Sequence, residues 1–363
     1  LLSAKNPYII AGNGVHASKA YDELQKIAEM IGAPVGTTAG GKSAIAETHE
    51  NAVGVFGNWG QEVANSLLSE SDVILVVGSR LTPTDTIFES EDLIDPSKQS
   101  IIQIDIEEKN ASWTYPVRQS LVGDAKKILK QMIDYMLTSE RKISEEDLSR
   151  RSTSIVNRKS LLNYMETEEM ISNEIPILPQ RAVKEIEAII DEKTKITLDA
   201  GENRVFMINL LKTKVPGSII APTASGAMGY AIPAALATKL VYPDHEVIAV
   251  CGDGGFPMTM NGLITAIQYN IKIIVVVINN SSLGWTKNNQ GDQIIATTFN
   301  DCDFSEIAKA FGCQGIRVTD PNRIKEALQF AKESDQSVVI DIVTTDKESY
   351  RKAQSLLMKK RNE

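Results

Sequence analysis

The chain has 363 residues, of which 42% are hydrophobic and 23% charged, and its formal net charge is −9 at pH 7. This length exceeds one ordinary hydrophobic core and indicates two domains. The negative charge argues against a nucleic-acid or anionic-membrane partner, because both are negatively charged and would be repelled.

Neither the cysteines nor the apolar runs suggest a secreted or membrane protein. The cysteines are three, with no metal-type spacing: Cys251, Cys302 and Cys313. They predict reduced thiols in a cytoplasmic protein, and the widely separated histidines make a zinc site unexpected. No apolar run is long enough to span a bilayer, and residues 1–12 lack the basic start of a signal peptide.

The first part of the chain alternates strand and helix patterns. Apolar runs at residues 7–12, 72–79 and 100–106 have the character of buried parallel strands. Residues 18–32 and 124–137 have the pattern of amphipathic helices. One face of the first helix is apolar and a glycine ends it: Ala20, Leu24, Ile27, Ala28, Ile31 and Gly32. This alternation predicts a doubly wound parallel sheet.

The same alternation returns after a charged segment. Residues 138–173 are dense in both charge signs and poor in aliphatic side chains, which indicates a partly helical linker. Further buried strands are expected at residues 196–201, 245–252, 271–280 and 337–344. We therefore predict an α/β protein of two doubly wound parallel-sheet domains, residues 1–137 and 174–363, joined by a charged linker over residues 138–173.

The strongest chemical signal follows the expected strand at residues 245–252. Gly252-Asp253-Gly254-Gly255-Phe256 stands at its end, and a helix and another strand lead to Asn279-Asn280. Ligands bind at such carboxyl ends, where glycines let backbone N–H groups approach a diphosphate. A carboxylate beside a diphosphate implies an intervening cation. Magnesium prefers oxygen ligands, which Asp253, Asn280 and a following backbone carbonyl can supply.

This order of elements resembles the thiamine diphosphate motif, in which GDG is followed after a helix and a strand by NN. Asn280 lies 27 positions after Asp253, as that motif requires. The resemblance implies that Asp253, Asn280 and the main-chain oxygen of Ser282 hold magnesium. The implied diphosphate-binding positions are three glycines: Gly252, Gly254 and Gly255. The alternative is a tight turn with a capping Asp, but the surrounding order of elements favours the motif.

Three further segments resemble acetolactate synthases. Gly226 and Met228 match a G-x-M-G stretch that holds the aminopyrimidine and packs a Met beneath the thiazolium, although a Met is more often simple core filler. Gly201 and Asn203 match a phosphate-contacting turn; Glu202 departs from the family pattern there, and a plain turn into a helix is the alternative. Leu283 and Gly284 fall in the cofactor- and substrate-facing segment, where LGWTK departs from the QGM of true acetolactate synthases and leaves the substrate open.

Residues 12–17 formally fit G-x-G-x-x-A after a strand, but no acidic residue follows about twenty positions on, as a dinucleotide site requires. The segment resembles the central domain of the same enzyme family, in which some members bind FAD or ADP. The FAD-using members resemble GARFDDRVTG where this chain has GSRLTPTDTIF. FAD is therefore not expected, and we interpret this domain as structural.

The resemblance covers two of the family's three domains. In the family, an N-terminal pyrimidine-binding domain supplies, across a subunit interface, the glutamate that activates the cofactor. No catalytic residue is identified in this chain, so we expect it to be inactive alone. It would need a partner chain or a missing N-terminal segment and would form at least a dimer. An exposed apolar face is expected on the second domain where the absent domain would dock.

Three functions remain open. The first is thiamine diphosphate- and magnesium-dependent decarboxylation and carboligation of a 2-oxo acid, as in acetolactate synthesis. The second is simple decarboxylation of a 2-oxo acid or cleavage of a 2-hydroxyacyl compound. The third is a non-catalytic thiamine diphosphate-binding or regulatory subunit, against which the intact pair Asp253 and Asn280 argues.

Overall fold

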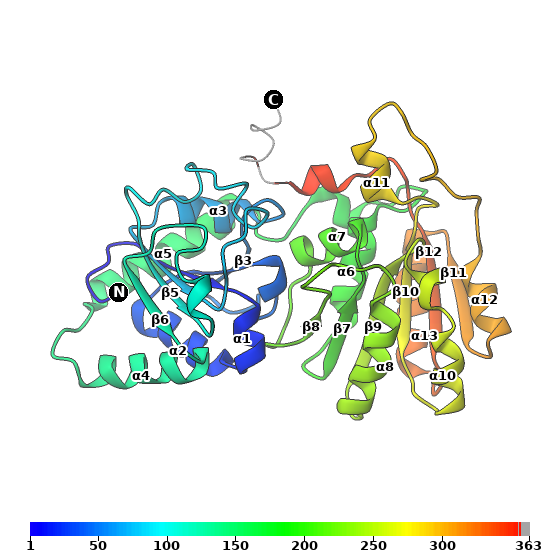
Figure 1. Ribbon diagram of the computed structural model, residues 1–363. Helices are drawn as coiled ribbons and strands as arrows, with labels where there is room; N and C mark the ends of the chain where they lie inside the picture. Colours follow the sequence, from blue (N-terminus) through cyan, green and yellow to red (C-terminus); the bar gives the residue numbers. More distant parts are fainter. Residues whose placement is uncertain (355, 357–363) are drawn as a thin grey trace. The chain divides into compact units, whose positions relative to one another are not determined.

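A computed structural model of the protein describes residues 1–354 and 356. The chain divides into two compact units (Figure 1). Among the described residues, unit 1 contains Leu1–Met165, Val215–Gly217, Gln354 and Leu356, and unit 2 contains Glu166–Lys214 and Ser218–Ala353. Within the described residues, no helix is both long and apolar enough to cross a membrane.

Unit 1 is built on a six-stranded parallel sheet with the order β3-β2-β1-β4-β5-β6. Its strands are β1 Pro7–Ala11, β2 Val35–Thr37, β3 Ala52–Val55, β4 Val73–Val77, β5 Ser100–Asp105 and β6 Gln119–Val122. Its helices are α1 Asn13–Ser18, α2 Tyr21–Ile31, α3 Glu62–Ser69, α4 Ala125–Thr138 and α5 Glu145–Leu161, with 3-10 turns at η1 Ala39–Gly41 and η2 Glu108–Asn110.

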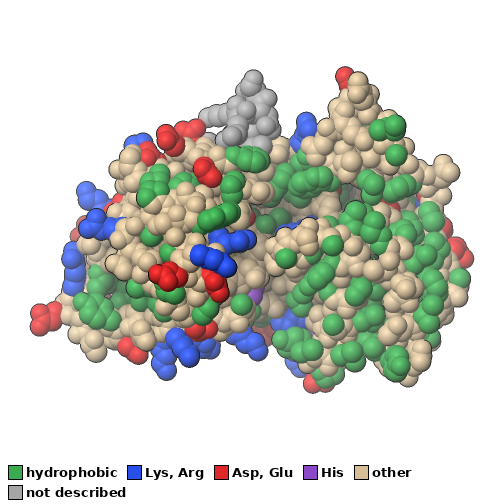
Figure 2. Space-filling model, viewed as in Figure 1, with side chains coloured by type: hydrophobic (Ala, Val, Ile, Leu, Met, Phe, Trp, Pro, Cys, Tyr) green, Lys and Arg blue, Asp and Glu red, His purple; other side chains and the backbone are tan. Residues whose placement is uncertain are grey.

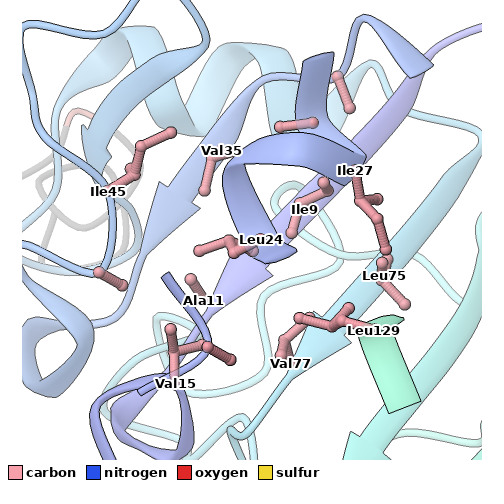
Figure 3. Close-up of a cluster of buried hydrophobic side chains, with 14 of the residues drawn as sticks. Ile9, Ala11, Val15, Leu24, Ile27, Val35, Ile45, Leu75, Val77 and Leu129 are labelled. Atoms are coloured by element: carbon pink, nitrogen blue, oxygen red, sulfur yellow. The ribbon is translucent and has the colours of Figure 1, made fainter. Parts of the chain in front are cut away.

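Alternate side chains of the unit 1 strands enter two separate cores. Ile9 and Ala11 of β1 join the core that α2 and α4 cover (Figure 3), whereas Tyr8 and Ile10 join the core on the opposite face. Leu24 of α2 is fully buried, as its place on the apolar face predicts. The helix ends at Gly32, whose φ of 60° is a left-handed conformation that glycine adopts without strain. The predicted helix and its stop are confirmed.

The charged segment at residues 138–173 contains α5, which packs on unit 1. Arg151 and Ile155 are buried. The two terminal nitrogens of the Arg151 guanidinium donate hydrogen bonds to the carbonyl oxygens of Ile31 and Ala4, so backbone acceptors stabilise most of this buried group. The helical part of the expectation is confirmed. The segment is nevertheless more than a solvated connection, because α5 covers part of a core.

Unit 2 is a second six-stranded parallel sheet with the order β11-β12-β10-β9-β7-β8. Its strands are β7 Thr194–Leu198, β8 Ile219–Ile220, β9 Glu246–Gly252, β10 Ile274–Asn279, β11 Gln314–Val318 and β12 Val338–Val343. Its helices are α6 Pro179–Ile189, α7 Glu202–Leu210, α8 Ala231–Val241, α9 Phe256–Thr259, α10 Gly262–Gln268, α11 Gly284–Asn289, α12 Phe304–Ala310 and α13 Ile324–Glu333, with 3-10 turns η3 Glu168–Ile171, η4 Pro321–Arg323 and η5 Tyr350–Ala353. The predicted fold class, two doubly wound parallel sheets, is confirmed.

Each sheet has a point where the strand order reverses direction, and ligands of open α/β sheets bind at such points. In unit 1 this point lies between β1 and β4, and the chain's own backbone fills it. The N–H of Gly14 donates to the Gly78 carbonyl at 2.9 Å, and a Cβ on Gly14 would lie 2.6 Å from the Gly78 Cα. The glycines of the G-x-G-x-x-A match are therefore required by packing between two loops. In unit 2 the reversal lies between β7 and β9.

Candidate cofactor site

A cavity in unit 2 lies at the carboxyl ends of β7, β9, β10 and β12. It is lined by eleven of the twelve residues that the sequence singles out: Gly201, Asn203, Met228, Gly252, Asp253, Gly254, Gly255, Asn280, Ser282, Leu283 and Gly284. Gly226, the twelfth, is not among the described residues that line it. Its φ is +64°, and an added Cβ there would meet nothing within 4 Å. The folding of unit 2 thus gathers segments more than eighty residues apart.

Asp253 lies at the centre of this edge of the sheet and is only 4% exposed. Its Oδ2 accepts hydrogen bonds from the backbone N–H groups of Asn280 (3.0 Å) and Ser282 (3.1 Å). Burial raises the pKa of the Asp253 carboxyl to about 6, although backbone N–H groups offset part of that effect. A buried carboxylate with a raised pKa is suited to a site that receives a cation.

The turn after β10 is folded around the side chain of Asn280. Its Oδ1 accepts hydrogen bonds from the N–H (3.1 Å) and the hydroxyl (3.0 Å) of Ser282. Ser282 forms an antiparallel bridge with Thr298. On the Ser282 side, the hydrogen bonds of this bridge are made by the carbonyl oxygen of Ser281 and the N–H of Leu283. The carbonyl of Ser282 is left outside that pairing, which keeps it available as a main-chain ligand.

The glycines of the GDGG turn allow close packing that side chains would prevent. A Cβ on Gly254 would lie 2.4 Å from Leu283 Cδ2 and 3.0 Å from Met228 Cε. A Cβ on Gly252 would lie 3.1 Å from Asn203 Nδ2. The backbone of this turn therefore packs directly against side chains of the neighbouring loops, at a distance that only glycine permits.

Asp199, at the end of β7, joins three of these loops and was not predicted as a site residue. Its Oδ1 accepts hydrogen bonds from the N–H groups of Gly229 and Ala200, and its Oδ2 accepts one from Ala231, each at 2.9 Å. A Cβ on Gly255 would lie 2.7 Å from the same carboxylate. The available signal is an Asp directly after a buried strand, but that signal does not reveal which backbone it binds.

Glu202, the departure from the family pattern, lies in the cavity wall and is 7% exposed. Its Oε1 accepts hydrogen bonds from Asn288 Nδ2 (2.7 Å) and from the N–H of Tyr350 (3.0 Å). Burial raises its pKa. The ring of Tyr350 stacks on Trp285, with 4.4 Å between the ring centroids. Glu202 thus connects the start of α7 with α11 and with η5.

The cavity also contains buried polar atoms without a hydrogen-bond partner among the described residues: Asn203 Oδ1 and Thr344 Oγ1. Such atoms are costly unless a ligand or water satisfies them. Within residues 1–354 and 356, the lining includes the carboxylates of Glu202, Asp253 and Glu348 and no Lys, Arg or His. No group of three or more His, Cys, Asp or Glu in that part of the chain could hold a metal. A cation here would therefore rely on Asp253 together with amide and main-chain oxygens.

Comparison with known proteins agrees with this arrangement. Residues 1–132 match the thiamine pyrophosphate enzyme central domain, and residues 199–342 match the thiamine pyrophosphate enzyme C-terminal TPP binding domain. The chain belongs to the thiamine pyrophosphate enzymes. Thiamine pyrophosphate is the thiamine diphosphate of the motif, and the second match includes both Asp253 and Asn280.

Acetolactate synthase large subunits are among the similar proteins. The chain is 36% identical to a probable acetolactate synthase large subunit of Methanococcus aeolicus over 94% of its own length and 58% of that protein. It is 32% identical to the acetolactate synthase large subunit of Buchnera aphidicola subsp. Acyrthosiphon pisum, over 95% and 60% of the two chains. It is 28% identical to a sulfoacetaldehyde acetyltransferase of Alcaligenes xylosoxydans xylosoxydans, over 95% and 62%. The chain thus spans about three fifths of these relatives.

Proposed function

We propose that the cavity of unit 2 holds the diphosphate of thiamine diphosphate together with Mg²⁺, and that the assembled protein decarboxylates a 2-oxo acid and joins the product to a second carbonyl compound. Bound thiamine diphosphate supplies the electron sink for this chemistry. The observation that carries the proposal is the position of Asp253. Its buried carboxylate meets the Asn280–Ser282 turn at the carboxyl edge of the sheet.

The residues present fit the cofactor. The GDGG backbone would hold the diphosphate, since its glycines carry no side chain between the backbone N–H groups and a ligand, and the turn lines the cavity. The carboxylate of Asp253, the amide oxygen of Asn280 and the main-chain oxygen of Ser282 would hold the metal. The cation would offset the repulsion between the diphosphate and the carboxylates that line the cavity. The orphaned hydroxyl of Thr344 adds a donor that the sequence pattern does not reveal.

A partner surface is supported by the exposed apolar side chains of unit 2. Figure 2 shows hydrophobic side chains gathered over the part of unit 2 where α8 and α10 lie in Figure 1. The exposed large apolar residues here include Leu240 and Val241 of α8, Met258 of α9, Ile264 of α10 and Tyr269, which directly follows α10. Soluble proteins seldom leave such a surface uncovered. We propose that a pyrimidine-binding domain with the activating glutamate covers it, and that this chain alone is inactive.

The acceptor carbonyl compound would be selected by the segment that follows the metal turn. The half-exposed Trp285 stands at the cavity, in a segment that departs from the acetolactate synthase pattern. Simple decarboxylation and 2-hydroxyacyl cleavage use the same cofactor site, and they differ in whether a second carbonyl compound is accepted. A non-catalytic binding subunit would keep the site and lack turnover.

The test adds a candidate partner domain. The purified chain, with thiamine diphosphate, Mg²⁺ and pyruvate, is assayed alone and with the separately produced part of the Methanococcus aeolicus relative that lies outside the match. Pyruvate consumption and acetolactate formation only in the mixture are the expected result. Acetaldehyde in place of acetolactate would favour the simple decarboxylase. Cofactor binding with no consumption in the mixture would favour the non-catalytic subunit.

A further inference from the structure

Asp341 is a buried carboxylate that the proposed cofactor chemistry does not use. It lies in β12, beside Val277 of β10 and Arg317 of β11, and is 0% exposed. Its Oδ1 accepts a hydrogen bond from Asn279 Nδ2 at 2.9 Å, and its Oδ2 accepts one from the N–H of Phe304 at 3.1 Å. Both oxygens are thus committed, which makes this carboxylate a rigid acceptor.

Asn279, the last residue of β10, connects Asp341 to the turn that follows this strand. Its Nδ2 also donates to the Cys302 carbonyl at 3.1 Å, and its Oδ1 accepts the N–H of Ser281 at 3.2 Å. Ser281 has a φ of 52°, a left-handed conformation that is strained for a residue with a side chain. Local hydrogen bonds of this kind keep such a conformation populated. The Asn279 amide therefore fixes the backbone between the two residues that would hold the metal, Asn280 and Ser282.

We propose that Asp341 is a positioning residue for the metal turn and acts through Asn279. The inference rests on the proposed function for the identity of the ligand, but its structural part concerns the turn alone. Without the Asp341 carboxylate, the Asn279 amide loses the acceptor that fixes its orientation, and the Ser281 N–H loses an aligned partner. The N–H groups of Asn280 and Ser282 would then be held less firmly against the Asp253 carboxylate. Outer partners of metal ligands commonly change metal affinity by about 10- to 100-fold.

A nearby carboxylate provides a matched control. Asp301 pairs with Arg317 at 2.5 Å and is exposed, and Arg317 also lies 3.9 Å from Asp341. Asp301→Asn therefore removes one charge from the same ionic cluster without touching Asn279. A simple electrostatic role for Asp341 would make Asp301→Asn and Asp341→Asn similar in kind. A positioning role would separate them.

The experiment is hydrogen exchange, followed by mass spectrometry, on the cofactor-free full chain. It compares wild type with Asp341→Asn, Asn279→Ala, their double variant and Asp301→Asn, each checked for native circular dichroism. Asp341→Asn leaves one acceptor oxygen for two donors, Asn279 Nδ2 and the Phe304 N–H, so Asp341→Asn and Asn279→Ala should both accelerate exchange in the peptide 279–284 by about tenfold or more. The double variant should exchange no faster than Asn279→Ala, and Asp301→Asn should match wild type. If Asp341→Asn does not fold, Asn279→Ala alone reports on the turn.

Wild-type exchange in Asp341→Asn, or additive effects in the double variant, would overturn the inference. A second readout connects it to the metal. Mg²⁺ with thiamine diphosphate should raise the unfolding temperature of wild type more than that of Asp341→Asn. If Asp341 had a merely structural role, Asp341→Asn would unfold at a lower temperature both with and without the ligands, and the increase caused by the ligands would equal that of wild type. An absent increment in wild type would count against the proposed function. The exchange result is independent of the cofactor, so the two failures are distinguishable.

Discussion

The carboxylate of Asp199 holds the backbone of Gly229 in unit 2, with 2.9 Å between Oδ1 and the Gly229 nitrogen. Gly229 directly follows Met228, the side chain that the family resemblance places beneath the thiazolium. Burial raises the pKa of Asp199, and the hydrogen bonds that its carboxylate accepts from backbone N–H groups lower it. The loop that would shape the cofactor is therefore fixed from the end of β7, by a residue outside the family motif.

Asp199→Asn tests this relationship. An amide keeps one oxygen acceptor but turns an NH₂ group toward a backbone N–H, so at least one of the three hydrogen bonds is lost. We expect about 1–3 kcal/mol of destabilisation and about 10- to 100-fold weaker thiamine diphosphate binding. Urea unfolding and calorimetric titration measure the two effects. Asp335→Asn, at an exposed position of the same unit, should match wild type in both; wild-type binding by Asp199→Asn would refute the assigned role.

Gly255→Ala should disturb the same carboxylate by steric means. The new Cβ would lie 2.7 Å from Asp199 Oδ1, so the carboxylate or the GDGG turn must move. We expect weaker cofactor binding and a lower unfolding temperature. Gly291→Ala is the comparison, because Gly291 has a φ of +61° with nothing within 4 Å of an added Cβ. That change introduces backbone strain of about 1–2 kcal/mol and should leave cofactor binding intact. Equal cofactor binding by the two variants would show that the close packing of the GDGG turn against Asp199 is not needed for binding.

In unit 1, Lys42 and Glu47 form an ion pair at 3.1 Å, with both side chains only 1% exposed. Lys42→Met should destabilise the protein by about 3–5 kcal/mol, because it leaves the Glu47 carboxylate buried without its counter-charge. The double variant Lys42→Met/Glu47→Leu should recover part of that loss. Chemical denaturation of the single and double variants provides the comparison. A double variant less stable than Lys42→Met would show that the remaining contacts of Glu47, and not its charge, control stability.

Burial raises the pKa of Asp341 to about 6, with Asp303 raising it further and Arg317 lowering it. The folded protein therefore holds a proton that the unfolded chain releases near its ordinary pKa of about 4. Because the folded protein binds more protons in this interval, the Asp341 carboxyl lowers the free energy of unfolding as pH rises from about 4 to about 6, by at most about 3 kcal/mol. The stability of wild type minus that of Asp341→Asn should fall across this interval and then stay level to pH 7. A difference that rises with pH would show the opposite shift.

The sequence predicts the parts of this protein that depend on periodicity and on one dense motif. The apolar face of α2 and the gathering of Asp253 with Asn280 both follow from local pattern and from the rule that parallel strands end at one edge. The inward position of Arg151 in α5 does not follow, because its partners are backbone carbonyls of remote segments. The contact of Asp199 with Gly229 is likewise hidden, since it joins loops thirty residues apart. Hydrogen bonds from backbone N–H groups to a side chain of another loop produce no repeating pattern in the sequence, so they cannot be predicted from it.

The most direct test of the central claim is calorimetric titration of thiamine diphosphate into the full chain, with and without Mg²⁺, for wild type and Asp253→Asn. Asp253→Asn is close to isosteric and removes the only carboxylate among the proposed ligands. We predict Mg²⁺-dependent binding by wild type and at least about 100-fold weaker binding by Asp253→Asn, beyond the usual effect of an outer partner. Binding of equal strength by both proteins, or wild-type binding that is indifferent to Mg²⁺, would contradict the metal–diphosphate site.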